Sequence, residues 1–194
     1  MKQKFAQFIS VIGHPLLTIP LFVLIVTFSK ENSSTAILVS FLIIGCFFIP
    51  VTIMLFVKSR NGSYSNFDVS NRIQRKSLYV FSIPLLTAVT IVLYLTDQSL
   101  SICLSVFFAL ILLIVSMVVN FFVKSSLHVS LNVFLAALVY GVDSKIAVAI
   151  LLFTLVLIWS RITLGRHTCK EVILGFILGF SLGLIMLHFQ GYIF

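Results

Sequence analysis

The stretch SLSICLSVFFALILLIVSMVVNFFV, residues 99–123, decides the class of this protein, because no charged side chain interrupts it. A membrane-spanning helix needs about 20 apolar residues, and this stretch is long enough. The whole chain shares the bias: 60% of its 194 residues are hydrophobic, 9% are charged, and the mean hydropathy is +1.21. Soluble domains carry about 25% charged residues, so we expect a polytopic integral membrane protein.

Similar apolar runs lie on both sides of this one, joined by polar links. We expect an all-α transmembrane helical bundle of six to seven spans, at residues 8–29, 36–57, 77–96, 99–123, 127–142, 145–160 and 171–189. The first run follows Lys2 and Lys4 as in a signal peptide, but it is too long and lacks a small-residue cleavage site. We therefore expect it to be a retained span.

Three polar segments alternate with pairs of spans. They are KSRNGSYSNFDVSNRIQRK (58–76), KSSLH (124–128) and SRITLGRHTCKE (160–171). With seven spans, parity places all three on the same face as the N-terminus. Of the 13 Lys and Arg residues, all except Lys30 and Lys145 fall on this face, and such an excess marks the cytoplasmic side. The net charge of +8 therefore indicates topology and contacts with membrane lipids, and no nucleic-acid partner.

The third polar segment pairs a histidine with a carboxylate. His167 and Glu171 are four residues apart, so at a helix start they share a face and Glu171 can accept a hydrogen bond from one ring nitrogen. That bond leaves the other nitrogen free as a base or nucleophile. Gly165 permits a chain break that folds Arg161 back over the same point, and the guanidinium suits phosphate oxygens.

The other two segments add cations and a second histidine. His128 opens a span whose start carries Lys124 and Ser126, while Arg72 and Arg75 are three apart and can face one way. Cations that neutralise phosphate oxygens, one attacking His and one proton-donating His are the parts that phosphoryl transfer requires. The cysteines are far apart and no carboxylate cluster is present, so we expect neither a metal nor a cofactor.

SRITLGRHTCKE resembles the third signature of the type 2 phosphatidic acid phosphatase superfamily, which reads Ser-Arg, five residues, His, three residues, Asp. Ser160, Arg161 and His167 match it, and Glu171 replaces the Asp. The second signature, Pro-Ser-Gly-His, resembles SSLH at 125–128. The first is Lys, six residues, Arg-Pro, where Arg75 matches the Arg, Asp68 stands at the Lys position and Lys76 at the Pro position. The resemblance covers roughly residues 58–185.

The resemblance implies a membrane phosphatase that acts on lipid phosphates. It implies that residues 1–57 are an N-terminal transmembrane hairpin and that residues 58–194 form the phosphatase-like core. It also implies a role for each matched residue: His167 the nucleophile, Glu171 its orienting partner, His128 the general acid, and a phosphate site made of Arg161, Arg75, Ser126 and Lys124. Arg72 has no counterpart in the signatures, and we expect it to compensate for the missing Lys. A carboxylate in a phosphate site would repel the substrate, so we expect Asp68 to pair with Arg72 or Arg75.

Several substrates and activities stay open. Candidate substrates are phosphatidic acid, phosphatidylglycerol phosphate, isoprenyl phosphates or diphosphates, and a phosphorylated lipid A, in a bacterial inner membrane. Alternative functions are a lipid phosphotransferase and a catalytically degenerate protein that binds lipid phosphate. A transporter is disfavoured because the charges gather at one face rather than at mid-bilayer. We expect His14 to cap a helix or to make an interfacial hydrogen bond rather than to take part in catalysis, and His188 to lie at the opposite end of the bundle.

Overall fold

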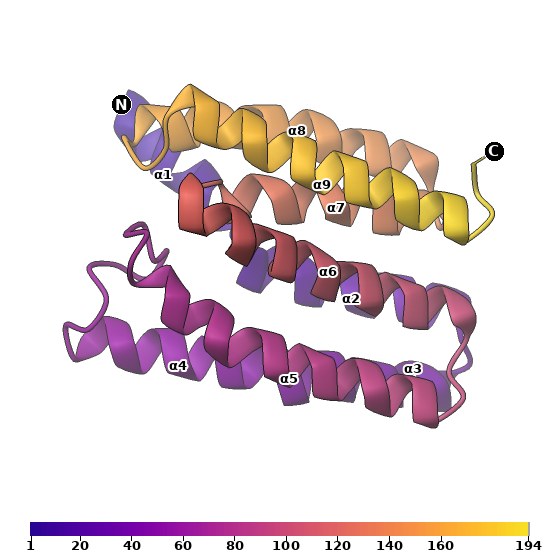
Figure 1. Cartoon of the computed structure of the whole chain (residues 1–194). Helices are drawn as coiled ribbons and strands as arrows, with labels where there is room; N and C mark the ends of the chain where they lie inside the picture. The colour runs from indigo at the N-terminus through magenta and orange to yellow at the C-terminus, as the bar shows by residue number, and fades with distance from the viewer. Residues whose placement is uncertain (194) are drawn as a thin grey trace.

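A computed structural model describes residues 1–193, and within that range every regular element is a helix (Figure 1). The elements are α1 (Lys2–Ile12), α2 (Pro15–Lys30), α3 (Ser33–Ser40), the π-helical η1 (Phe41–Phe48), α4 (Ile49–Arg60), α5 (Arg75–Leu95), α6 (Leu100–Phe122), α7 (Leu127–Tyr140), α8 (Ser144–Thr163) and α9 (Cys169–Phe189). The all-α prediction is confirmed.

Among the described residues, five helical segments are long and apolar enough to cross a membrane. They are Ser33–Arg60, which joins α3, η1 and α4, together with α5, α6, α8 and α9. A sixth span results if α1 and α2 are counted as one bent span. The predicted span 127–142 is the 14-residue α7, about 21 Å long against a hydrocarbon thickness of about 30 Å. Instead α7 packs inside the bundle, against α2, α8 and α9.

The predicted first span, 8–29, is two helices that meet at an angle of 42°. Gly13 ends α1, and α2 starts at Pro15, whose ring has no N–H to donate and suits a first helical turn. The His14 side chain caps α2, because its Nδ1 accepts the backbone N–H of Leu16 at 3.2 Å. Asn132 on α7 binds the freed carbonyl of Gly13 at 2.9 Å, which holds the break against the centre of the bundle.

A row of glycines lets α9 approach α7 closely. Gly175, Gly179 and Gly183 recur at every fourth residue, one helical turn apart, so they share a face. A Cβ at Gly175 would lie 2.6 Å from the carbonyl oxygen of Ser126, and one at Gly179 would meet the backbone of Ser130. Small residues allow this backbone approach, which dispersion then stabilises in a membrane, where no hydrophobic effect acts between helices.

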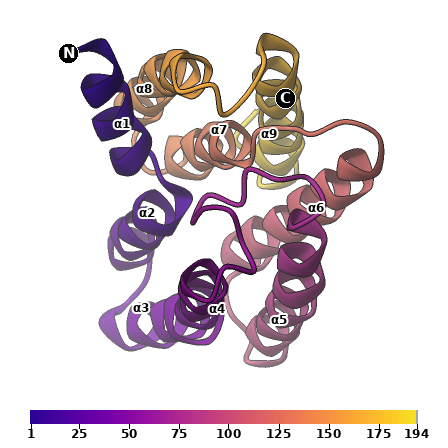
Figure 2. The ribbon, with the colours of Figure 1, turned by 90° about the vertical axis from the view of Figure 1, so that its left-hand side faces the viewer.

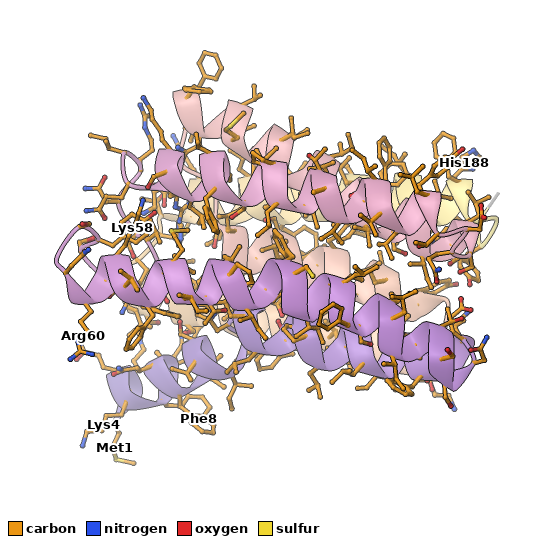
Figure 3. The ribbon with its side chains drawn as sticks, turned by 90° about the horizontal axis from the view of Figure 1, so that it is seen from below. Met1, Lys4, Phe8, Lys58, Arg60 and His188 are labelled. Atoms are coloured by element: carbon orange, nitrogen blue, oxygen red, sulfur yellow. The ribbon has the colours of Figure 1, made fainter. Side chains whose placement is uncertain are left out.

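The three polar segments meet at one end of the bundle, as parity predicts. The loop 61–74 between α4 and α5 crosses this end, between α2, α4, α6 and α7 (Figure 2). Met1, Lys4, Lys58 and Arg60 lie at the same end, whereas His188 lies at the other (Figure 3). The N-terminal helix also joins the polar end, because the Ser160 hydroxyl donates to the carbonyl of Ala6 at 2.5 Å.

Gly179→Ala should destabilise the protein even though alanine favours helix more than glycine does. The added methyl group would be forced against the Ser130 backbone, and overpacking of this kind costs about 1–3 kcal/mol. We expect a lower thermal unfolding midpoint in detergent, while Ser181→Ala on the exposed side of α9 should leave it unchanged. Equal midpoints for the two variants would contradict the close contact of α7 and α9.

Candidate functional site

A buried ion pair lies at the centre of the polar end. The Arg161 side chain, near the end of α8, is fully buried, and its Nη1 donates to Asp68 Oδ2 at 2.8 Å and to Ser10 Oγ at 2.6 Å. Arg166 Nη1 approaches the same carboxylate oxygen at 2.6 Å. A buried guanidinium without a counter-charge would be strongly destabilising, so Asp68 connects the loop 61–74 to α8.

The backbone of the loop fixes where this carboxylate points. Val69, directly after Asp68, is buried with φ 47°, a conformation that is uncommon for a β-branched residue. Its carbonyl accepts the Nε–H of Arg75 at 2.9 Å, and the Asn66 side chain accepts the backbone N–H of Ser70 at 3.1 Å. These bonds compensate for the strain of the turn and direct Asp68 inward.

The prediction that Asp68 pairs with an arginine was right in kind but named the wrong residues. Arg75 donates to the carbonyls of Val69 and Ser125, at 2.9 and 2.5 Å. Arg72 is exposed, and its Nη1 donates to the carbonyl of Phe122 at 2.9 Å. Arg72 therefore lies outside the site, and Arg166 is the cation that the sequence analysis missed.

His167 and Glu171 form the predicted pair, with 2.7 Å between Nδ1 and Oε2. They do not share a helical face, however, because Thr168 is the N-cap of α9 and His167 precedes it. Glu171 also takes part in the capping box with Thr168, and Lys124 Nζ lies 3.5 Å from the same carboxylate. Gly165, with φ 64°, supplies the predicted chain break.

Burial and charge keep His167 neutral. Burial lowers the pKa of the imidazolium, and the nearby charges of Arg75 and Lys124 lower it further, to about 2. With Nδ1 donating its proton to Glu171, the lone pair stands on Nε2, which is the form that can attack phosphorus. Burial favours the neutral acid at Asp68, but the nearby His14 ring and the charge of Arg161 outweigh it and hold its pKa below the ordinary value.

The second polar segment contributes buried groups at the start of α7. Ser126 is its N-cap and His128 lies one residue inside, both almost fully buried. The backbone N–H of Ser126 donates to the carbonyl of Glu171 at 3.0 Å, which joins the second and third segments. Lys124 completes the joint by donating to the carbonyl of Arg166 at 2.8 Å.

Several buried polar atoms at this end have no hydrogen-bond partner among residues 1–193. They include Nε2 of His14, His128 and His167, Nε and Nη2 of Arg161, and Oγ of Ser125 and Ser126. Buried polar groups are normally satisfied, and each exception calls for an explanation. Most of these atoms are nitrogens on groups of positive or neutral charge, so an anion with several oxygens is the ligand that fits them best.

His14 belongs to this site although the sequence analysis treated it only as a helix cap. The capping is confirmed, but the Nε2 of the same ring lies 3.4 Å from Asp68 Oδ1, and its ring stacks edge-on against His128 with centroids 4.7 Å apart. The break at Gly13 and Pro15 is the signal that would have found it, because it turns residue 14 toward the centre of the bundle.

The ring atoms of His14 and His128 and the carboxylate of Asp68 lie within 4.8 Å of one another, a grouping that resembles a metal site. The tautomer argues against one. His14 Nδ1 accepts a backbone N–H, so the ring proton is on Nε2 and faces Asp68, whereas a metal needs a lone pair there. Asp68 Oδ2 is also engaged by two arginines. The group suits a hydrogen-bonded network better than a metal.

Comparisons of the chain with protein-family models, with curated proteins and with solved structures give no significant match.

Asp68→Asn should show whether this carboxylate is the counter-ion of Arg161 and whether a bound anion can replace it. Loss of the charge leaves Arg161 buried without its counter-ion, and breaking such a pair costs about 3–5 kcal/mol, so the unfolding midpoint should fall. Millimolar inorganic phosphate should restore it more in Asp68→Asn than in the wild type, because an anion binding only the folded state stabilises it. Asp97→Asn, in the exposed α5–α6 turn, is the matched control. Absence of any phosphate rescue would contradict an anion site at Arg161.

The depressed pKa of His167 predicts a dependence of stability on pH. An unfolded imidazole titrates near pH 6.5, so between pH 6.5 and about 2 the unfolded state binds a proton that the folded state does not. Acid therefore favours unfolding in this window. The unfolding midpoint should fall from pH 7 to pH 5, and fall less in His167→Gln. His188→Gln at the far end should keep the wild-type slope; an identical slope in His167→Gln would refute the burial of a neutral His167.

Proposed function

We propose that this protein is an integral membrane phosphatase that hydrolyses the phosphate ester or diphosphate of a lipid through a phosphohistidine on His167. The observation that carries the proposal is the convergence of unpartnered buried atoms from separate segments: Nε2 of His167, Nε2 of His128, and Nε and Nη2 of Arg161. A nucleophile, a proton donor and a guanidinium fork are the groups that phosphoryl transfer needs in one place.

In the first step, the lone pair of His167 Nε2 attacks phosphorus and the bond from phosphorus to the lipid oxygen breaks. His128 enters this step as the imidazolium and gives its Nε2 proton to the departing oxygen, which leaves His128 neutral. Glu171 stabilises the positive charge that develops on the His167 ring through the 2.7 Å contact at Nδ1. In the second step, His128 takes a proton from water as the water oxygen attacks phosphorus. The bond from phosphorus to Nε2 breaks, which releases inorganic phosphate and restores neutral His167.

The phosphate oxygens would bind Arg161, whose free Nε and Nη2 offer two donors, with Arg75, Lys124 and Ser126 around them. Asp68 already neutralises one edge of Arg161 at Nη1. Substrate can therefore approach the other edge of the guanidinium without displacing the ion pair. In this arrangement Asp68 positions Arg161 and does not touch the phosphate.

The proposed setting is the cytoplasmic face of a bacterial inner membrane. The charged end of the bundle also carries Lys4, Lys58 and Arg60 (Figure 3), and positive residues favour that face. A phosphate at membrane-surface level would reach this end while the hydrocarbon part of the lipid stays at the depth of the apolar helices.

A second candidate function is the binding of a lipid phosphate without turnover. It is favoured by the Asp68 carboxylate, which lies 3.8 Å from His128 Nε2 as well as against Arg161. If Asp68 binds the protonated ring of His128 while a lipid phosphate is in the site, the proton stays on His128 and does not reach the leaving oxygen.

The experiment is phosphate release by the purified protein from phosphatidate, phosphatidylglycerol phosphate, isoprenyl phosphates and diphosphates, and phosphorylated lipid A. His167→Ala should abolish release and any acid-labile phosphoenzyme. His128→Ala should lower turnover by about 10²–10⁴-fold, the usual contribution of a general acid, and Glu171→Gln should lower it without changing thermal stability. His188→Ala, at the other end of the bundle, should behave as the wild type.

Two results would count against hydrolysis. Full activity in His167→Ala would remove the proposed nucleophile. Binding of lipid phosphates by the wild type with no release from any of them would favour the binding function instead.

A further inference from the structure

A cavity of about 380 Å³ begins at the candidate site and continues through the bundle. His14, Asp68 and His128 line its near end, so the cavity ends at the carboxylate that pairs with Arg161. Lys30 and Gln190 line the far end, where α2 and α9 finish. An object that fills it therefore has one end beside Asp68 and His128 and the other near the opposite end of the bundle.

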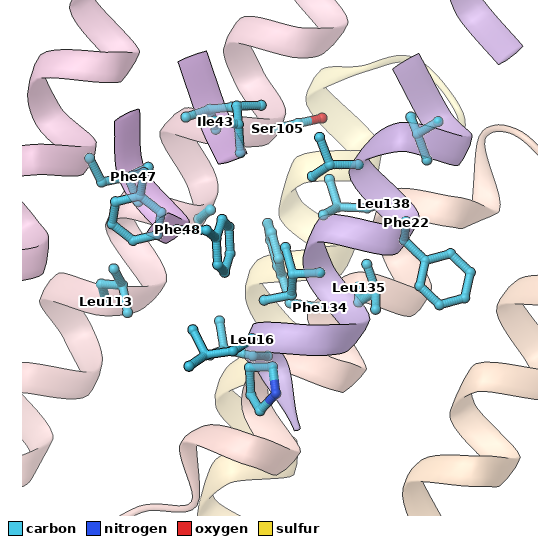
Figure 4. A pocket seen from close by; sticks show the side chains of 18 of the residues that line it. Leu16, Phe22, Ile43, Phe47, Phe48, Ser105, Leu113, Phe134, Leu135 and Leu138 are labelled. Carbon is cyan, nitrogen blue, oxygen red and sulfur yellow. The ribbon is translucent and has the colours of Figure 1, made fainter. Parts of the chain in front are cut away.

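The walls between these ends are apolar. The side chains that project around a common space are Leu16, Phe48, Leu113, Phe134 and Leu138 (Figure 4). Protein interiors are ordinarily packed without voids of this size, and most of the side chains along the cavity are apolar, with a few hydroxyls such as those of Tyr79 and Ser82 between them. A hydrocarbon is the occupant whose chemistry matches these walls.

The dimensions of the cavity fit one chain. Helix α2 runs along it from Pro15 to Lys30, 16 residues, or about 24 Å at 1.5 Å per residue, whereas one membrane leaflet is only about 15 Å deep. The volume lies at the low end of the range for pockets that hold one small ligand. An extended chain therefore fits, and a volume at the low end of this range favours one chain over two side by side.

Polar contacts close the far end. Lys30 Nζ donates to the Tyr192 hydroxyl at 2.7 Å, and Ser99 Oγ donates to Glu31 at 2.7 Å. These four residues all line the cavity. Since a terminal methyl group gains nothing from such groups, they set a limit to the length of chain that the cavity accepts.

We propose that this cavity binds the single hydrocarbon chain, acyl or prenyl, of a one-chain lipid phosphate, and so selects such lipids over two-chain lipids. The selectivity rests on the proposed function, because the phosphate of the same molecule lies at Arg161. The chain-binding step itself needs no turnover, so it is measured separately.

The direct test is binding of alkylphosphonates, which cannot be hydrolysed, to the protein in nanodiscs. Leu113 points into the cavity, nine residues before the end of α6 and so about 14 Å from the site. Leu113→Trp should weaken the binding of hexadecylphosphonate by about tenfold or more and leave the binding of octylphosphonate unchanged. Leu100→Trp, the same change at an exposed position of α6, should alter neither. Retained octylphosphonate binding also shows that the variant is folded.

A second measurement needs no variant. Hexadecanol carrying a terminal diazirine should label residues at the far end of the cavity in the wild type, and lysophosphatidate or farnesyl phosphate should suppress the labelling while phosphatidate should not. Labelling only of lipid-facing residues, or equal competition by phosphatidate, would overturn the cavity proposal whether or not phosphate is released. Cavity labelling that one-chain lipid phosphates suppress, without release from any lipid, would support the cavity and reject hydrolysis. Stronger competition by lysophosphatidate would indicate an acyl chain, and stronger competition by farnesyl phosphate would indicate a prenyl chain.

Discussion

The pairing of Arg161 with Asp68 is the constraint on which the polar end of this bundle depends. Arg161 is fully buried, and a buried cation is tolerated only beside an opposite charge and with its donors engaged. One nitrogen of its fork meets both Asp68 and Ser10. The loop 61–74, α1 and α8 are thus held together by a single guanidinium, while its two remaining donors stay free of protein partners within the described chain. Arg161 therefore stabilises the fold through Nη1 and keeps Nε and Nη2 available for a ligand such as the proposed phosphate.

The short helix α7 explains how the site lies inside the bundle. Three residues around the start of α7 are nearly fully buried: Ser125, Ser126 and His128. The helix itself begins at Leu127, directly after Ser126. The glycine row of α9 permits this depth, because the backbone of Ser126 can approach Gly175 closely. A longer α7 would carry His128 out to the surface, where water would compete for its ring and for any bound anion.

The break between α1 and α2 has a corresponding effect on the other side of the site. It turns His14 toward Asp68 and His128, and it sets α2 along the apolar cavity that starts from these residues. The polar end and the cavity therefore meet at His14, Asp68 and His128, and the cavity is mostly apolar beyond them. The proposed one-chain lipid phosphate has the same division into a polar head and an apolar chain.

The sequence by itself determined the helical membrane class, the gathering of three polar segments at one end, the His167–Glu171 pair and the turn at Gly165. These follow from apolar run lengths, parity and spacings of a few residues, which are local properties. Only the tertiary structure decided that Asp68 meets Arg161, 93 residues away, that Arg72 turns outward, and that His14 enters the site. Spacing cannot decide such pairings, because every arginine in the loop offers the same charge. Burial selects the partner: a carboxylate stabilises most the guanidinium that water cannot reach.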